Sequence, residues 1–219
     1  MSRLRVEDEG PLPFLLVVPE NRGSDVHPVL LFLHGHDEGP PTDLRVGITR
    51  HGPLRPGNTV AALDKFVIVG PQLPVRGDLW FQHANEVREI IRYVHEEHRG
   101  DPDRTYLTGF SFGGNGVFDL ALLQPDTWTA LWAVDPVRVP PRDPRRPVWL
   151  SFGQIARFSK RGFIQRLGLK PALESPDGER VFLDQGASHV GSATLAYQDE
   201  RIYSWLLARR LGLEAESAT

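Results

Sequence analysis

Residues 104–124 constrain the fold of this chain more than any other stretch of the sequence. They begin with residues 105–108, whose apolar and β-branched side chains are typical of a buried strand. The motif G-x-S-x-G follows at once, with Ser111 at its centre, and a helical pattern of apolar residues then runs up to Pro125. This motif between a strand and a helix predicts a nucleophile elbow, a sharp turn that exposes the serine at one edge of a sheet.

The composition excludes several kinds of site. The chain has no cysteine, which rules out disulfides, thiolate metal ligands and a cysteine nucleophile. Its 25 Lys and Arg residues against 28 Asp and Glu give a net charge of −3, so no electrostatic argument favours nucleic acid or an anionic membrane surface as a partner. We find neither a signal-peptide pattern nor an apolar run of about 18 residues. We therefore expect a cytoplasmic protein without a nucleic-acid or membrane partner, and its oligomeric state stays open.

Short apolar segments alternate with helical patterns along the chain. The expected strands are residues 4–6, 14–18, 28–33, 66–69, 105–108, Ala130–Val134, Val148–Phe152 and 180–183, and the expected helices are residues 85–98, 112–124, part of 155–167 and 193–211. Residues 40–58 are rich in proline and glycine and should be mostly irregular, with at most a short helix nearby. This alternation predicts one α/β domain, residues 1–213, with a mostly parallel sheet covered on both faces and a flexible tail, residues 214–219. Ligands of such sheets bind where the strands end.

Three segments of the sequence resemble one known family. Residues 33–39 (LHGHDEG), 101–114 (DPDRTYLTGFSFGG) and 203–207 (YSWLL) resemble the α/β-hydrolase superfamily, closest to the esterase and predicted-peptidase branch related to dienelactone hydrolases and polyhydroxyalkanoate depolymerases. The similarity extends from about residue 29 to the final helix, and the segment around Ser111 is its most specific part. The resemblance implies an α/β-hydrolase fold without a large lid, and a Ser-His-Asp hydrolase that acts on esters without a cofactor.

A serine nucleophile needs a base within hydrogen-bond reach, and the base needs a group that orients it. His189 is the best candidate for the base, because it follows the last expected strand and precedes the last helix. In the resembling families the acid follows the strand before, in a loop where this chain has Ala156. Asp135 at the end of an earlier strand is our first candidate for the acid, although it can equally cap a turn before Pro136. Asp184 is our second candidate.

The remaining site residues are assigned by their position in the fold. The backbone N–H groups of His36 and Phe112 are expected to form the oxyanion hole. Trp80, Phe81 and Phe110 are candidates for the substrate pocket, although each can equally be a core residue. The His-x-His triplet that ends at His36 lacks further ligands at suitable spacing, so we expect no metal.

The sequence thus predicts a serine esterase that hydrolyses a small-molecule ester through an acyl-enzyme. Two alternatives stay open. The first is a catalytically weakened, hydrolase-fold binding protein that lacks the triad acid, for which Ala156 is the motive. The second is an acyltransferase, which would use the same residues.

Overall fold

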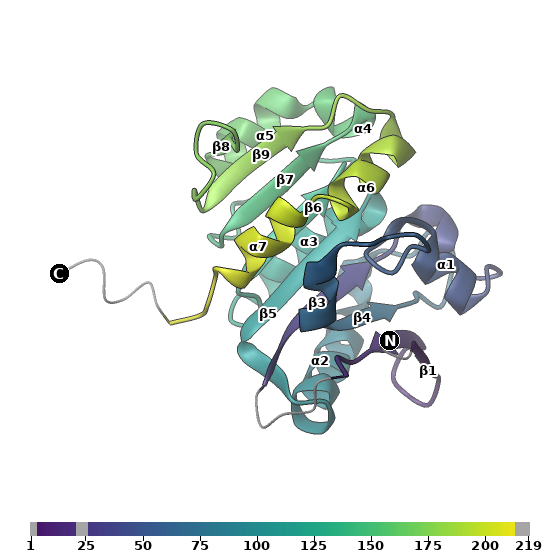
Figure 1. Ribbon diagram of the computed structural model, residues 1–219. Helices are drawn as coiled ribbons and strands as arrows, with labels where there is room; N and C mark the ends of the chain where they lie inside the picture. Colours follow the sequence, from purple (N-terminus) through teal and green to yellow (C-terminus); the bar gives the residue numbers. More distant parts are fainter. Residues whose placement is uncertain (1–3, 21–25, 213–219) are drawn as a thin grey trace.

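The computed structural model describes residues 4–20 and 26–212, so the predicted tail at residues 214–219 lies outside the described residues. In this part of the chain a nine-stranded sheet has the strand order β1-β2-β4-β3-β5-β6-β7-β9-β8 (Figure 1). The strands are β1 (Arg5–Glu7), β2 (Phe14–Val17), β3 (His27–Leu33), β4 (Val67–Pro71), β5 (Gly100–Phe110), β6 (Ala130–Val134), β7 (Val148–Phe152), β8 (Lys170–Pro171) and β9 (Arg180–Asp184). Strands β1 and β2 pair antiparallel with their neighbours and the other pairs are parallel, which confirms the mostly parallel sheet.

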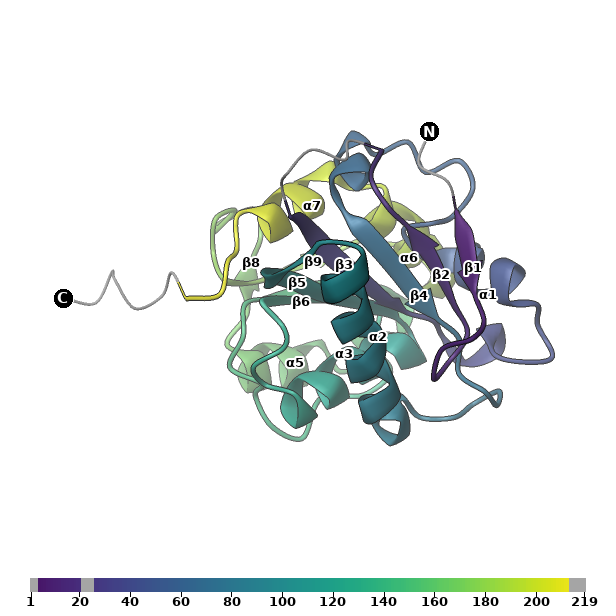
Figure 2. The same ribbon diagram turned by 90° about the horizontal axis from the view of Figure 1, so that it is seen from below.

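Helices cover both faces of this sheet (Figure 2). One face carries α2 (Ala84–Glu97), α3 (Phe112–Leu123) and α5 (Lys160–Leu167), and the other carries α1 (Leu44–His51), α6 (His189–Tyr197) and α7 (Glu200–Leu207). A short helix, α4 (Gln154–Arg157), follows β7, and three 3-10 turns, η1 (His36–Glu38), η2 (Ala61–Lys65) and η3 (Trp80–His83), lie in the connections. Each face of the sheet has its own apolar core, to which the facing helices contribute. This two-sided burial explains why the central strands read as continuous apolar runs.

The register of the central strands places the ends of β5 and β6 side by side. Phe110, the last residue of β5, pairs with Val134, the last residue of β6. Directly beyond this pair, the N–H of Ser111 donates to the carbonyl of Val134 at 3.0 Å, and the N–H of Asp135 donates to the carbonyl of Ser151 in β7 at 2.8 Å. Ser111 and Asp135 therefore leave neighbouring strands at the same level of the sheet.

The structure differs in extent from two expectations about helices. The predicted closing helix at residues 193–211 is two helices, because Asp199 interrupts it and caps α7 by accepting the N–H of Arg201. The first of the two, α6, also begins earlier, at His189. Residues 40–58 are less irregular than expected, since they contain the eight-residue helix α1, which Asp43 caps.

Candidate active site

The turn at Ser111 has the geometry that the elbow motif predicts. Ser111 has φ 58° and ψ −116°, a conformation that is strained for a side chain larger than glycine. The flanking glycines permit this turn to pack closely. A Cβ on Gly109 would lie 2.3 Å from the carbonyl oxygen of Gly113, and a Cβ on Gly113 would lie 1.9 Å from that of Leu33. The start of α3 therefore contacts the end of β3 directly, and the Ser111 side chain is held at the edge of the sheet where the strands end.

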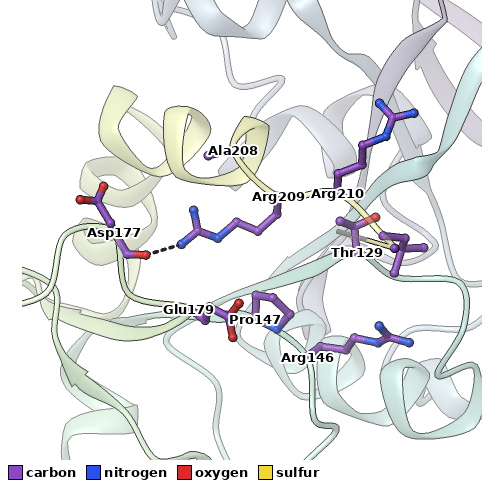
Figure 3. A pocket seen from close by; sticks show the side chains of 10 residues that line it. Thr129, Arg146, Pro147, Asp177, Glu179, Ala208, Arg209 and Arg210 are labelled. Atoms are coloured by element: carbon purple, nitrogen blue, oxygen red, sulfur yellow. Dashed lines mark hydrogen bonds between the residues drawn. The ribbon is translucent and has the colours of Figure 1, made fainter. Parts of the chain in front are cut away.

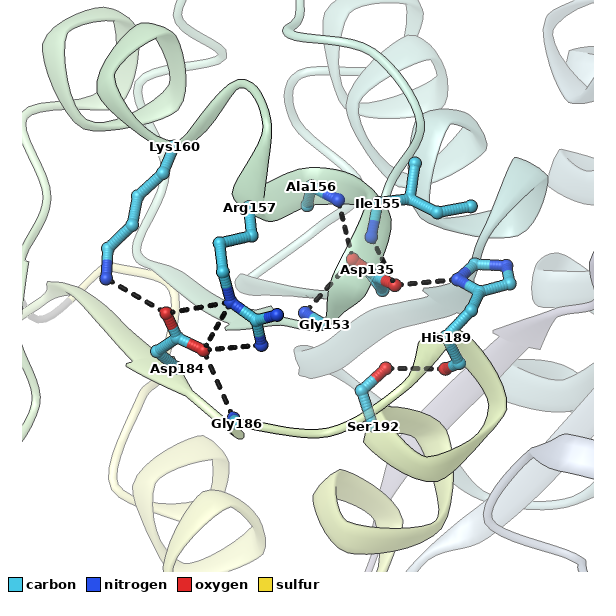
Figure 4. A network of polar contacts seen from close by, with 10 residues as sticks. All are labelled: Asp135, Gly153, Ile155, Ala156, Arg157, Lys160, Asp184, Gly186, His189 and Ser192. Atoms are coloured by element: carbon cyan, nitrogen blue, oxygen red, sulfur yellow. Dashed lines mark hydrogen bonds and ion pairs between the residues drawn. The ribbon is translucent and has the colours of Figure 1, made fainter.

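The structure brings Ser111, His189 and Asp135 together in one chain of hydrogen bonds. His189 is the first residue of α6, and its Nε2 atom lies 2.9 Å from Ser111 Oγ. Its Nδ1 atom lies 2.6 Å from Asp135 Oδ2 (Figure 4). The side chain of Asp135 is fully buried, whereas that of His189 is 26% exposed. With Nδ1–H directed at the carboxylate, Nε2 carries a lone pair that faces the hydroxyl of Ser111.

The Asp135 carboxylate is surrounded by donors from the segment that follows β7. Its Oδ1 accepts the N–H groups of Gly153 at 3.0 Å and Ala156 at 2.7 Å, and its Oδ2 accepts the N–H of Ile155 at 3.2 Å (Figure 4). A Cβ on Gly153 would lie 2.4 Å from Asp135 Oδ2, so only glycine leaves room for the carboxylate. Asp135 thus caps the start of α4 and also contacts His189. The loop after β7, where the resembling families have the acid, instead binds the carboxylate that follows β6.

Asp184, the second candidate for the acid, is engaged elsewhere. Its carboxylate pairs with Arg157 at 2.9 Å and with Lys160 at 3.1 Å (Figure 4). These hydrogen bonds, foremost the one from Arg157, lower the pKa of Asp184 to about 2. The pairing connects the end of β9 to α4 and α5, so Asp184 stabilises the packing of these elements next to the site.

The two residues expected to form the oxyanion hole begin neighbouring structural elements. His36 is the first residue of η1 and Phe112 is the first residue of α3. The N–H group of the first residue of a helix has no acceptor within the helix, which leaves it available to a ligand. The rings of His36 and Phe112 pack edge to face with their centroids 5.0 Å apart, so the two turns are neighbours.

His34, which precedes the oxyanion loop, is a buried and fully hydrogen-bonded side chain. Its Nδ1 donates to the carbonyl of Gly35 at 2.6 Å, and its Nε2 accepts the N–H of Leu73 at 3.0 Å. This arrangement requires a neutral ring, and burial lowers the pKa of His34 to about 4. His34 thereby fastens the loop after β3 to the loop after β4. The sequence offers no signal for the contact with Leu73, because Leu73 lies 39 residues further along the chain.

The burial of His34 has a measurable consequence for stability. Below its ordinary pKa of 6.5 the unfolded chain binds a proton at this ring, and the folded protein does not until about pH 4. As the pH is lowered from 6.5 to about 4, the free energy of unfolding should therefore fall. His34 should contribute about 3 kcal/mol to this decrease. Urea unfolding at several pH values is expected to show a shallower pH dependence for His34→Asn than for wild type. Parallel slopes for His34→Asn and wild type would contradict the assignment.

The three aromatic residues proposed for the substrate pocket lie in different environments. Trp80 is a core residue, 2% exposed, whose indole N–H donates to the carbonyl of His34 at 3.1 Å. Phe110 is 3% exposed and its ring packs on that of His189 with centroids 4.5 Å apart. Phe81 is 43% exposed in η3. Of these three rings, that of Phe110 packs on His189, whereas Trp80 contributes to the core beneath the loop after β3.

His51 and Glu38 are neighbours of the site that the sequence analysis did not select. The ring of His51 lies 5.2 Å from that of Phe110, on the last turn of α1, and its Nε2 is 3.6 Å from Glu38 Oε1. Burial and the nearby Arg50 and Arg55 lower the pKa of His51 to about 4. The region around residue 50 has no motif of its own, so only the packing of α1 reveals this proximity.

A cavity of about 240 Å³ lies at the opposite edge of the sheet (Figure 3). It is lined by residues that precede strands, among them Thr129, Pro147 and Glu179. The guanidinium of Arg209 lies beside it and donates to the carbonyl of Asp177 at 2.9 Å. Because Ser111 follows a strand, this cavity cannot belong to the same site.

Two further features are absent from residues 4–20 and 26–212. No three His, Asp or Glu side chains in these ranges are arranged to hold a metal ion. Within the same ranges, no helix has both the length and the apolar character needed to cross a bilayer.

The comparisons with known proteins identify the fold. No protein-family model and no curated protein matches the sequence. Among solved structures, a thermostable esterase superposes with a TM-score of 0.71 at 19% identity over 96% of this chain, which spans 63% of that esterase. A fluorophosphonate-binding serine hydrolase from Staphylococcus aureus superposes with a TM-score of 0.66 at 14% identity, over 94% of this chain and 97% of its own. The feruloyl esterase module from Clostridium thermocellum, complexed with sinapinate, gives 0.69 at 13% identity over 92% and 87%. With its strand order, these superpositions show that the chain has the α/β-hydrolase fold.

Proposed function

We propose that this protein is a serine hydrolase that cleaves carboxylic esters through an acyl-enzyme. The observation that carries the proposal is the hydrogen-bonded chain from Ser111 through His189 to Asp135. A serine, a base and an orienting carboxylate in this order form the arrangement that activates a serine hydroxyl on several unrelated folds. The structural similarity to esterases agrees with the proposal.

The geometry supports the following sequence of steps. Ser111 Oγ attacks the acyl carbon while its proton passes to Nε2 of His189, 2.9 Å away. The buried Asp135 carboxylate stabilises the imidazolium that forms, and the N–H groups of His36 and Phe112 stabilise the oxyanion. His189 then gives the proton to the leaving alkoxide. Water attacks the acyl-enzyme by the same route in reverse, which releases the acid and restores the serine.

The surroundings of Ser111 favour small substrates. Residues 135–147, between β6 and β7, contain neither helix nor strand, so this connection supplies no lid. Phe110 offers an apolar ring beside His189. A long acyl chain gains binding energy only where apolar walls bury its surface. An open site with few apolar walls therefore suits a short acyl group better than a long one.

The two alternatives differ in their support. The weakened binding protein was suggested by Ala156, and its motive disappears because Asp135 supplies a carboxylate to His189. An acyltransferase would use the same groups with an alcohol in place of water, so product analysis must separate it from a hydrolase.

The wild-type protein is expected to hydrolyse p-nitrophenyl acetate faster than p-nitrophenyl palmitate, and peptides hardly at all. The reason is the open site around Ser111. Initial rates on an acyl-chain series and a peptide panel provide the measurement, and mass spectrometry of products formed with added methanol distinguishes free acid from methyl ester. A preference for long chains or peptides would contradict the proposed substrate class.

A further inference from the structure

Glu38 is a buried acid beside the nucleophile that the proposed mechanism does not use. It is 5% exposed and is the last residue of η1, the turn that begins with His36. A Cβ on Gly35 would lie 2.8 Å from Glu38 Oε2 and 3.5 Å from the Cβ of Ser111. The Glu38 carboxylate and the nucleophile therefore contact the same side of Gly35.

The Glu38 side chain packs against the backbone at the start of its own turn. Gly35 is the N-cap of η1 and Glu38 is the third residue after it. Burial raises the pKa of the Glu38 carboxyl above its ordinary range, against the opposite effect of the nearby Arg50. The side chain contacts the N-cap residue, with Oε2 2.8 Å from the position that a Cβ on Gly35 would take. The contact fixes the peptide unit directly before the N–H of His36.

The main chain of Glu38 is fixed from two further sides. The side-chain amide of Gln72, which follows β4, donates to the carbonyl of Glu38 at 2.7 Å. A Cβ on Gly47 of α1 would lie 2.4 Å from the same carbonyl oxygen, so α1 packs against the turn. The turn is therefore held by β4, by α1 and by its own carboxylate.

Burying this carboxylate is costly, because the charged Arg50 is not within hydrogen-bond distance and the ring of His51 is neutral. Arg50 Nη1 lies 3.7 Å and His51 Nε2 lies 3.6 Å from Glu38 Oε1. A buried acid without a close ion pair raises the free energy of the folded state. The burial has one structural consequence: the turn η1 is fixed next to Ser111.

We propose that Glu38 is a positioning residue for the oxyanion hole. Its side chain packs against Gly35 and so fixes the peptide unit that precedes the N–H of His36, which then points at the oxygen that becomes charged. The inference rests on the proposed function and extends it to a residue that touches no substrate. Glu38 should therefore help to stabilise the transition state and not the bound substrate, because the oxyanion forms only in the transition state.

Glu38→Ala is expected to lower kcat for p-nitrophenyl acetate by about 10- to 100-fold, with KM little changed, because one of two donors is misplaced. Glu38→Gln should recover most of the activity, since its side chain has nearly the same shape and can pack against Gly35 in the same way. Affinity for a trifluoromethyl ketone, which mimics the oxyanion, should fall in parallel with kcat. Asp37→Asn is the control, because Asp37 lies in the same turn with its side chain 59% exposed, and it should behave as wild type.

Thermal unfolding of each variant shows whether it is folded. If Glu38→Ala does not fold, Gly35→Ala tests the same contact from the other side: its φ of −81° and ψ of −167° suit alanine, while the new Cβ displaces the carboxylate. Wild-type kcat in a folded variant of either kind overturns the inference, as does a Glu38→Gln enzyme as slow as Glu38→Ala. A wild-type protein without esterase activity overturns the proposed function and the inference with it.

Discussion

Ser111→Ala is expected to lower ester hydrolysis by about 10⁴-fold or more while the protein stays folded. The reason is that Ser111 Oγ is the atom that His189 Nε2 contacts at 2.9 Å, and no other hydroxyl can replace it on the elbow. The substitution removes one oxygen atom from a residue that is 8% exposed, so it creates almost no cavity. The remaining activity would come from the oxyanion donors and from substrate binding.

A fluorophosphonate probe tests the same nucleophile without a substrate. The probe should form a covalent adduct on Ser111 of the wild-type protein, located by mass spectrometry of its peptides, and no adduct on Ser111→Ala. Ser159→Ala is the matched control, because Ser159 is an exposed serine at the start of another helix and its removal should leave labelling unchanged. Equal labelling of Ser111→Ala and wild type, or none in the folded wild type, would contradict the assignment of the nucleophile.

The features that the sequence predicted well are those encoded by local pattern. Ala130–Val134 and Val148–Phe152 were predicted with the bounds that β6 and β7 have, because strands buried on both faces are continuous apolar runs. The elbow at Ser111 was equally clear, since the close packing of Gly109 and Gly113 leaves no other residue type possible. These elements suffice to place candidates from three strand ends at one edge of the sheet.

The features that the sequence could not supply depend on contacts between distant segments. Trp80 and Phe110 are both aromatic residues near strand ends, and only the packed structure separates a core indole from a ring that contacts His189. Glu38 looks like a surface acid in its loop, and its burial follows from the packing of α1. The donors to Asp135 are backbone N–H groups, which carry no sequence signature.

Asp135→Asn is expected to lower kcat by about 10⁴-fold, and the contacts of the carboxylate explain why so small a change has such an effect. All four groups around it are donors: three backbone N–H groups from the start of α4 and the Nδ1 of His189. Asparagine has one oxygen and one NH2 group. If its oxygen stays with Gly153 and Ala156, its NH2 faces His189, which must then present a lone pair at Nδ1. The proton moves to Nε2, where it faces Ser111 and blocks general-base catalysis.

The same substitution should cost stability only moderately. Asparagine has nearly the shape of aspartate, and the N–H of Ile155 is the backbone donor that loses its acceptor, at a cost of about 1–3 kcal/mol. Thermal unfolding should therefore show a folded protein with a lowered melting temperature, which separates loss of catalysis from loss of structure.

Asp184→Asn is the control that distinguishes the two candidate acids. It weakens the pairing with Arg157 and Lys160 but leaves the contact between Asp135 and His189 in place, so kcat should change far less than in Asp135→Asn. The pH dependence of kcat provides a second test. In Asp135→Asn, kcat should rise at high pH, because hydroxide can then act as the base that deprotonates Ser111. Wild-type activity in Asp135→Asn, or a larger loss in Asp184→Asn, would show that the carboxylate at the end of β6 only caps α4 and that His189 is oriented by another group.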